Sequence, residues 1–418
     1  MISFWRIFCL EFVALVRSKS LALLLAASAV WMFVAPAVFR GDGTASGARE
    51  LAVHYSLGGV AALVATALLM SAAGSISGER VSRRLALALV RPVPRFTLAF
   101  GRMAALVAAG ALVLGVAALV EAARNDLSRP SRHVLRPLLP SPREEAEIIY
   151  ESYMRDPTTP EAVRKAGRSA VIRLLAQRAL DNYLTMPTNT VSDFEFPRIA
   201  EGASVRLRFT NSYGMRDDVR GTIEAAGMTG AVSNLTQSVI EVPLVGAPTA
   251  SAGPVKVSLR NTGSAGVMLR PRRDLEVLLP ADGFGVNLLR AWLELVAMLA
   301  LLVSFGVFLG AGLGRPTAVF TAIVTLLVSE MSPSVLEQYP AELAMDRADE
   351  IGLYLTRFAA EVTNPLSSLR PLEALSADEC VEWREVLRTL AFDGLLLPLL
   401  FALLSAAVLP RKLEQQGG

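Results

Sequence analysis

The chain has 418 residues, of which 53% are hydrophobic and only 19% are charged. Soluble globular proteins are usually less apolar and carry about 25% charged residues, so the composition excludes an ordinary soluble protein. The formal net charge of +3 is too small to indicate a nucleic-acid partner. The apolar excess lies in separate runs with segments of ordinary polarity between them, which predicts a protein that crosses a membrane several times.

Six runs have the length of a membrane-spanning helix, about 20 residues. They are Leu21–Phe39, Tyr55–Ser77, Met103–Val120, Ala291–Leu313, Pro316–Met331 and Thr389–Leu409. The first run lacks a convincing small-residue cleavage site, so we expect an uncleaved span rather than a signal peptide. The fifth run is short, but Arg315 and Pro316 mark a tight turn before it, and we expect it to span as well. The predicted fold class is mainly α, a six-helix transmembrane domain with an inserted extracytoplasmic α+β domain.

Basic residues gather in alternate connecting segments, which the positive-inside rule assigns to the cytoplasm. They are Arg6, Arg17, Lys19, Arg80, Arg83, Arg84, Arg91, Arg95, Arg102, Arg315, Arg411 and Lys412. The segment Ser332–Glu385 is rich in Asp and Glu instead. We therefore expect a multi-pass protein of the bacterial cytoplasmic (inner) membrane with both termini in the cytoplasm. In this topology Cys9 and Cys380 lie on opposite sides of the membrane and cannot form a disulfide.

Residues 1–20 are expected to form an interfacial elbow helix. Within them Phe4–Arg17 combines apolar residues at helical spacing with charged ones, which suits a helix at the inner membrane surface. The alternative is that this segment simply lengthens the first span. Residues 21–120 then contain spans one to three, with the loop 78–96 between spans two and three.

Residues 121–287 are too long and too polar for a simple connection, so we expect an extracytoplasmic domain there. Residues 141–186 are rich in Glu, Ala, Arg and Leu and predict helices, whereas residues 187–280 alternate like strands separated by Gly, Asn, Asp and Pro. The strand candidates are Ser204–Thr210, Ser238–Val245, Val255–Arg260 and Leu275–Leu279. Short strands at this spacing favour a small β-sandwich.

Residues 288–331 hold spans four and five. Gly306, Gly310 and Gly314 share one helical face of span four, which permits close packing of two helices within the subunit or across a dimer. The alternative is that span four only frays at its cytoplasmic end.

Residues 332–387 are expected to be an extracytoplasmic helical segment, with an amphipathic helix over Ala341–Ala360 at the outer surface. Residues 388–418 hold span six and a cytoplasmic tail. Pro398 is expected to bend span six, because proline removes a helical hydrogen bond.

The sequence contains no motif for catalysis, for a metal site or for ATP binding. It lacks HExxH, Gly-x-Ser-x-Gly and GxxxxGK[ST], so we expect no enzyme activity, no metal and no cofactor in this chain. Ionisable residues do fall within the spans. Arg290 and Glu294 are four apart and able to pair on one helical face, and Asp393 lies one turn into span six. A substrate or proton role is one interpretation, and structural pairing or snorkelling near the outer interface is the favoured one.

A short amphipathic helix is predicted within the basic loop 78–96. Its apolar positions are Leu85, Leu87, Leu89 and Val90. Pro92 and Pro94 end it. Such a helix, held between two spans, can press against a soluble partner and pass on its movement. The alternative is that the arginines of the loop only fix the topology and touch anionic lipid.

A set of residues in and just after this loop carries a resemblance to a known family. The set consists of Glu79, Arg80, Leu85, Leu87, Leu89, Arg91, Pro92, Val93, Arg95, Leu98, Gly101 and Arg102. It resembles a stretch that recurs in permease subunits of ABC transporters of the type-two exporter class, from which the chain departs at Val81 and at Arg83 and Arg84. Leu15–Lys19 and the ending after Asn364 are similar to the family's two ends. The resemblance covers the spans and their short loops but not the large outer segment.

The resemblance implies that Glu79–Arg91 is a coupling helix that docks on an ATP-binding subunit. Arg84 and Arg91 would supply charged contacts, and the three leucines the apolar ones. The implied partners are a P-loop ATP-binding subunit, which holds the ATP, a second permease, either identical or a sister, and membrane lipid. The implied transport is export.

Two other classes of protein compete with a permease. A membrane scaffold or sensor would bind a partner through residues 121–287, but a single span suffices for an anchor. A secondary carrier more often shows internal repeats and charged residues near the membrane midplane, and the sequence shows neither. An ATP-binding protein encoded next to this chain would favour the permease.

Overall fold

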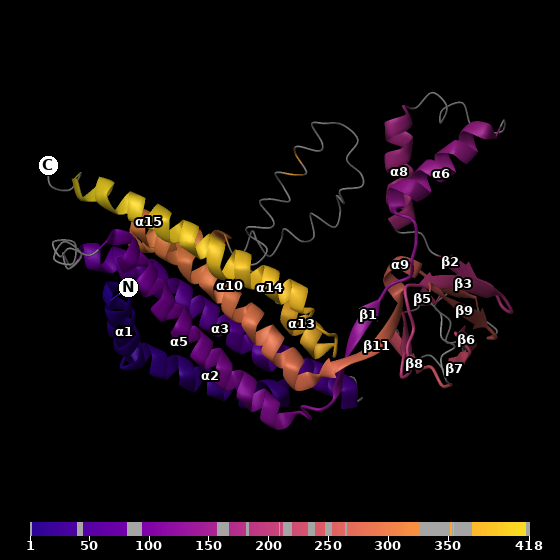
Figure 1. The fold of residues 1–418 in the computed structure, drawn as a ribbon, viewed down its shortest axis with the longest axis horizontal. Helices are drawn as coiled ribbons and strands as arrows, with labels where there is room; N and C mark the ends of the chain where they lie inside the picture. Colours follow the sequence, from indigo (N-terminus) through magenta and orange to yellow (C-terminus); the bar gives the residue numbers. More distant parts are fainter. Residues whose placement is uncertain are drawn as a thin grey trace. The chain divides into compact units, whose positions relative to one another are not determined.

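The computed structural model describes residues 2–39, 45–81, 94–156, 167–180, 184–208, 210–211, 220–232, 239–246, 253–263, 266–325, 352, 354 and 370–414. The chain divides into two compact units. The first comprises Met1–Ser131, Asp282–Val335 and Arg357–Gly418, and the second comprises Arg132–Ala281 and Leu336–Thr356. Figure 1 shows that the long helices gather in the first unit and the strands in the second.

The helices of the first unit follow the predicted apolar runs. They are α1 (Ile2–Val16), α2 (Lys19–Val38), α3 (Ala45–Val81), α5 (Arg95–Arg124), α10 (Phe284–Gly312), α13 (Arg370–Ser376), α14 (Trp383–Ala391), the π turn η2 (Phe392–Leu396) and α15 (Leu397–Glu414). Residues 315–325 are helical as well.

Among the described residues, five helical segments are long and apolar enough to cross a membrane. They are Lys19–Val38, Glu50–Ser77, Arg95–Arg124, Phe284–Gly312 and Trp383–Val408. Five of the predicted runs therefore form helices of spanning length, as in a multi-pass membrane protein. The remaining run, Pro316–Met331, is helical as far as residue 325, and the rest of it lies outside the described residues, as does most of the predicted helix Ala341–Ala360.

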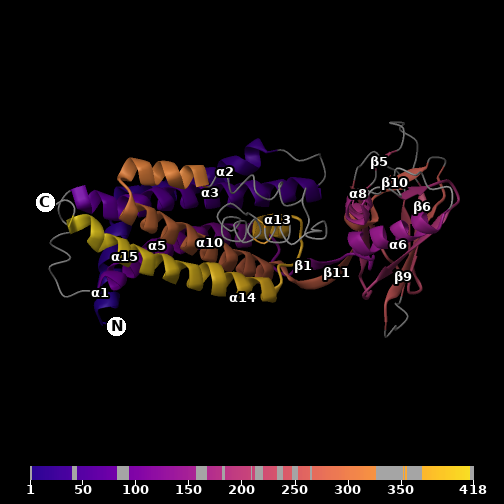
Figure 2. The same ribbon diagram turned by 90° about the horizontal axis from the view of Figure 1, so that it is seen from above.

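α10 is the central helix of the first unit. It packs against α3, α5, α14 and α15, and Figures 1 and 2 both show it running alongside α3 and α15. Of its most apolar stretch 72% is buried, against 22% for the corresponding stretch of α2. Buried side chains of α3, α5 and α10, among them Val64, Leu106 and Leu299, meet in one hydrophobic cluster. A movement of any neighbouring helix must therefore be accommodated by α10.

α1 and α2 are separate helices. Ser18 lies at the junction, where its hydroxyl donates to the Leu15 carbonyl at 2.6 Å and accepts from the Leu21 amide at 3.2 Å. The two helices run in different directions (Figure 1). A turn thus separates the N-terminal segment from the first span, and its place at the membrane surface stays a prediction.

The last span contains a π turn close to the predicted bend. The Leu397 amide bonds the Phe392 carbonyl, one residue farther back than in an α-helix. Pro398 has no amide hydrogen, so the Gly394 carbonyl, four residues before it, loses its ordinary donor. Pro398 lies in the first turn of α15, directly after the π turn, and the bend of the span stays a prediction.

The second unit combines a few helices with three small sheets. Its helices are α6 (Pro142–Arg155), α8 (Arg168–Leu180) and the short α9 (Pro271–Asp274). Its strands are β1 (Pro130–Leu135), β2 (Leu184–Met186), β3 (Val191–Phe196), β4 (Ser204–Arg208), β5 (Thr210–Asn211), β6 (Gly221–Ala225), β7 (Met228–Val232), β8 (Val239–Pro243), β9 (Val255–Asn261), β10 (Val267–Leu269) and β11 (Leu275–Gly283). The sheet orders are β1-β11-β4-β8, β2-β10-β5 and β3-β9-β6-β7.

The three sheets close over one hydrophobic core, to which Phe196, Leu207 and Leu269 each contribute from a different sheet. In β9 every second side chain, beginning with Val255, is buried, as the period of a strand requires. The helices α6 and α8 bury a smaller cluster of their own around Ile172.

The four predicted strands are confirmed as β4, β8, β9 and β11. The sequence does not predict the hairpin β6–β7, whose turn is Ala226-Gly227 with φ angles of 49° and 83°. This left-handed geometry matches a two-residue hairpin turn, for which Asn-Gly or Asp-Gly is the usual signal. Because Ala226 replaces Asn or Asp, the hairpin carries no strong sequence signal.

Candidate functional site

Most of the predicted coupling residues lie outside the described part of the chain. They are Arg84, Leu85, Leu87, Leu89 and Arg91. Glu79 and Arg80 belong to the last turn of α3, of which the structure describes only the backbone at these positions. The described parts are thus the two ends of the loop, where α3 ends at Val81 and α5 begins at Arg95.

α1 is packed tightly against the first turns of α5, directly after this loop. The Arg102 guanidinium donates to the Glu11 carboxylate at 3.0 Å, and Arg102 is buried. Gly101 allows the close approach, because a Cβ at this position would lie 2.9 Å from an α1 side chain. The Phe4 and Phe100 rings add an aromatic contact at 5.5 Å. The start of α5 and α1 therefore form one packed body.

Two of the three predicted packing glycines lie against α3. A Cβ at Gly310 would lie 2.4 Å from the Ala73 carbonyl oxygen, and one at Gly306 would lie 2.9 Å from the Ala72 Cβ. The structure describes this contact within one chain, between α10 and α3. Gly314 takes no part in it, because a Cβ there would meet no atom within 4 Å. Gly314 follows the end of α10, so it no longer continues the helical face of the other two.

Arg290 pairs with Asp282, not with Glu294 as the helical spacing predicts. Its guanidinium also donates to the Cys380 sulfur at 3.0 Å and to the Val381 carbonyl at 3.1 Å. Arg290 is only 4% exposed, so its five N–H donors need partners inside the protein. Two of its partners, Cys380 and Val381, lie about 90 residues away in the sequence, so helical spacing cannot reveal them.

Glu294 and Asp393 are both buried where α10 meets η2, with 8% and 7% of their surfaces exposed. The two elements are close together, since a Cβ added to Gly394 would lie 3.3 Å from the Ala297 Cβ. Neither acid is exposed at the surface of the helix bundle, as snorkelling would require. In the described part of the chain no group of three or more His, Cys, Asp or Glu side chains could hold a metal ion.

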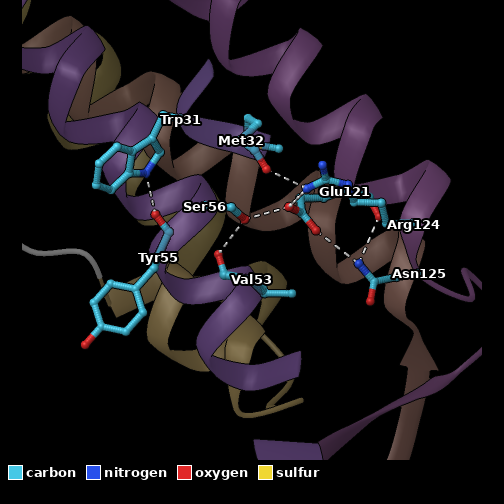
Figure 3. Close-up of polar contacts among 8 residues, drawn as sticks. All are labelled: Trp31, Met32, Val53, Tyr55, Ser56, Glu121, Arg124 and Asn125. Carbon is cyan, nitrogen blue, oxygen red and sulfur yellow. Dashed lines mark hydrogen bonds and ion pairs between the residues drawn. The ribbon is translucent and has the colours of Figure 1, made fainter. Parts of the chain in front are cut away.

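A second buried polar cluster, which is not among the predicted sites, joins α2, α3 and α5 (Figure 3). Glu121 is 2% exposed and accepts hydrogen bonds from the Ser56 hydroxyl at 2.6 Å and from the Asn125 amide at 3.2 Å. Arg124 contacts the same carboxylate at 3.4 Å and donates to the Met32 carbonyl of α2 at 3.0 Å. Glu121 and Arg124 of α5 together therefore join α3 and α2 to α5 at one end of the bundle.

The sequence does hold a signal for this cluster. Glu121 is the first acidic residue after a long apolar run, and Arg124 follows one helical turn later. A neighbouring hydrogen bond also joins α2 to α3, because the Trp31 indole donates to the Tyr55 carbonyl at 2.8 Å (Figure 3). Burying a polar group costs less free energy near the end of a membrane helix than in its middle, so acidic and basic residues one turn apart at such an end indicate a buried pair.

In the second unit, charged side chains of alternating sign form a row across one sheet. Arg206 of β4 lies between Glu276 of β11 and Glu241 of β8 in the strand register, and its guanidinium is 3.5 Å from the Glu276 carboxylate. Arg132 of β1, the strand at the opposite end of the sheet order from β8, also pairs with Glu241. Opposite charges on neighbouring strands stabilise the register, so this row has a structural explanation.

Comparison of the chain with protein-family models, curated proteins and solved structures finds no match.

Proposed function

We propose that the chain is the membrane-spanning permease subunit of an ATP-driven ABC transporter, working with a separate ATP-binding subunit. The loop 78–96 carries this proposal, because a basic loop with a leucine pattern joins α3 and α5, two helices of spanning length. Its residues follow the order that recurs in type-two exporters. The remaining features of the proposal are six spans, an outer location for the second unit, cytoplasmic termini, a bacterial cytoplasmic membrane and a second permease subunit.

In this proposal the closure of two ATP-binding subunits pushes on the loop. The body formed by α1 and the start of α5 offers a mechanical support for that push, since Arg102 and Glu11 hold the two helices together. α3 passes the displacement to α10, because the close contact at Gly310 leaves no room for the helices to slip. The exit of a substrate would follow from the altered packing of the spans.

The test is purification of the full chain from its native host in mild detergent, followed by an ATPase assay of the eluate. A stoichiometric P-loop subunit with ATPase activity is the expected result. In the double charge reversal Arg84→Glu and Arg91→Glu, the P-loop subunit should no longer co-purify, or its ATPase activity should no longer be stimulated by the chain. A matched control, Arg143→Glu with Arg155→Glu on the surface of α6, makes the same change in net charge away from the loop and should retain both.

Recovery of the intact protein without any ATP-binding subunit would count against the permease. The second candidate is a membrane scaffold or sensor, which the separate hydrophobic core of the second unit favours. For a scaffold or sensor, the expected result is an extracytoplasmic protein in the same eluate, bound through Arg132–Ala281.

A further inference from the structure

Three segments of the first unit meet where the chain passes to the second unit and returns. The outgoing leg, residues 125–131, follows α5, and the returning leg, residues 282–287, leads into and includes the start of α10. The Phe284 amide donates to the Arg129 carbonyl at 2.7 Å, and the Gly285 amide donates to the Leu127 carbonyl at 3.2 Å. Gly283 permits this approach, because a Cβ there would lie 2.8 Å from the Leu127 oxygen. The two legs are thus bonded to each other.

The third segment, residues 377–383, binds both legs and is called the clip below. Asp378 pairs with Arg129 of the outgoing leg. Asn287, which is fully buried, uses both ends of its amide, donating to the Glu379 carbonyl at 2.7 Å and accepting from the Val381 amide at 2.8 Å. Because both ends of this buried amide are paired, it fixes the position and the orientation of the clip relative to α10.

Arg290 ties the clip to the returning leg a second time. Its guanidinium bonds Asp282 of the leg, and it bonds the Cys380 sulfur at 3.0 Å and the Val381 carbonyl at 3.1 Å in the clip. The same guanidinium lies 4.9 Å from the centre of the Trp383 ring, the first residue of α14. The contact therefore reaches the start of the last span.

The clip has a defined backbone conformation. Asp378 adopts a left-handed φ of 57° after α13. The Glu379 amide bonds the Ala374 carbonyl at 2.7 Å, and the Asp378 amide bonds the Leu375 carbonyl at 3.3 Å. These are the two bonds of a Schellman helix end. α13 packs on α3 and α10, so the clip is anchored before it begins.

We propose that the clip couples the position of the last span to the two legs that carry the second unit. A displacement of α14 and η2 relative to α10 moves Trp383 and Val381 with it, and the clip then pulls on Asn287 and Arg129. The base of the inserted unit thereby responds to events within the membrane. This coupling does not depend on which protein drives the last span.

The experiment measures hydrogen exchange of the Phe284 and Gly285 amides, which bond the two legs, in the full chain in lipid nanodiscs. Asn287→Ala should raise both exchange rates about tenfold, the effect of losing hydrogen bonds of ordinary strength. Asn261→Ala is the matched control, because Asn261 is also buried and also bonds backbone groups, but in the second unit. It should leave the two rates unchanged.

Coupling itself is tested by Gly394→Val, which pushes η2 away from α10, because a Cβ at this position would lie 3.3 Å from the Ala297 Cβ. We expect this variant to change the two exchange rates about fivefold, the low end of typical coupling between sites. The change should vanish when Asn287→Ala is also present. If Asn287→Ala does not fold, Arg129→Gln replaces it, because that variant removes only the partly exposed pair with Asp378.

Unchanged rates in Gly394→Val would overturn the proposal. So would an equal change with and without the clip variant, because the displacement would then reach the legs by another route. Amides in the contact of α3 with α10 serve as a reference for global unfolding, and they should keep their protection in every variant.

Discussion

At the scale of single residues, the buried carboxylate of Glu121 shows how a polar group can be accommodated at the end of a membrane helix. Three side chains donate to it, those of Ser56, Arg124 and Asn125. A buried carboxylate without such donors would be strongly destabilising. The cluster therefore holds α2, α3 and α5 in one arrangement.

Glu121→Ala is expected to lower the free energy of unfolding by about 1–3 kcal/mol, because it removes the 2.6 Å bond of the buried Ser56 hydroxyl and the charge that faces Arg124. Glu121→Gln keeps an acceptor oxygen and should cost less. Thermal unfolding in detergent measures both. Glu151→Ala on the exposed side of α6 is the control, and a loss in the control equal to that in Glu121→Ala would contradict the structural role.

Cys9 and Cys380 are free thiols. Burial raises the pKa of the Cys380 thiol, and the nearby positive charge of Arg290 only partly opposes this. The thiolate is the reactive form, so less of it exists in the folded protein at a given pH than in the unfolded chain.

In a Cys9→Ala background, alkylation of Cys380 by iodoacetamide should therefore be slow at neutral pH. It should accelerate only when the pH rises above the range of an ordinary thiol. Mass spectrometry of the labelled peptide gives the rates, with the denatured protein as the reference. Equal rates in the folded and denatured protein at neutral pH would contradict the raised pKa.

At the scale of elements, the contact between α10 and α3 depends on the absence of side chains at two positions. Gly310→Ala should lower the free energy of unfolding by about 1–3 kcal/mol, because its Cβ would lie 2.4 Å from a backbone carbonyl that cannot move aside easily. Gly314→Ala is the matched control in open space and should stay within about 0.5 kcal/mol of the wild type. Calorimetry in detergent measures the unfolding of both variants, and equal destabilisation by Gly310→Ala and Gly314→Ala would contradict the packing role.

The helices and several strands of this protein could be predicted from periodicity, because apolar runs and alternation are local properties. The pairing of Arg290 could not, since its partners come from Asp282 and from the distant clip, while Glu294 is merely close in sequence. The hairpin turn at Ala226 was hidden for a different reason, because its left-handed backbone is held by the surrounding sheet and not by a turn residue. The predicted coupling residues between Arg84 and Arg91 stay a prediction.

At the scale of the whole molecule, the distribution of arginines predicts the side of the membrane on which each part lies. Replacing Leu174, an exposed residue of α8, by cysteine in a Cys9→Ala, Cys380→Ala background places one thiol on the second unit. A membrane-impermeant maleimide should label it in spheroplasts, in which the outer face of the cytoplasmic membrane is exposed. A cysteine in place of Gly418 should be labelled only after the membrane is permeabilised. The reverse pattern would invert the topology.

The bond between the Arg129 carbonyl and the Phe284 amide has a consequence for how this chain can vary in length. Because β1 and β11 are neighbours in one sheet, the chain departs and comes back at adjacent points. The ends of the inserted unit are thus already closed on each other, and the membrane helices do not depend on its length for their connection. The second unit could therefore be enlarged, shortened or replaced by a short turn. In each case the same two chain ends would lie side by side at the start of α10.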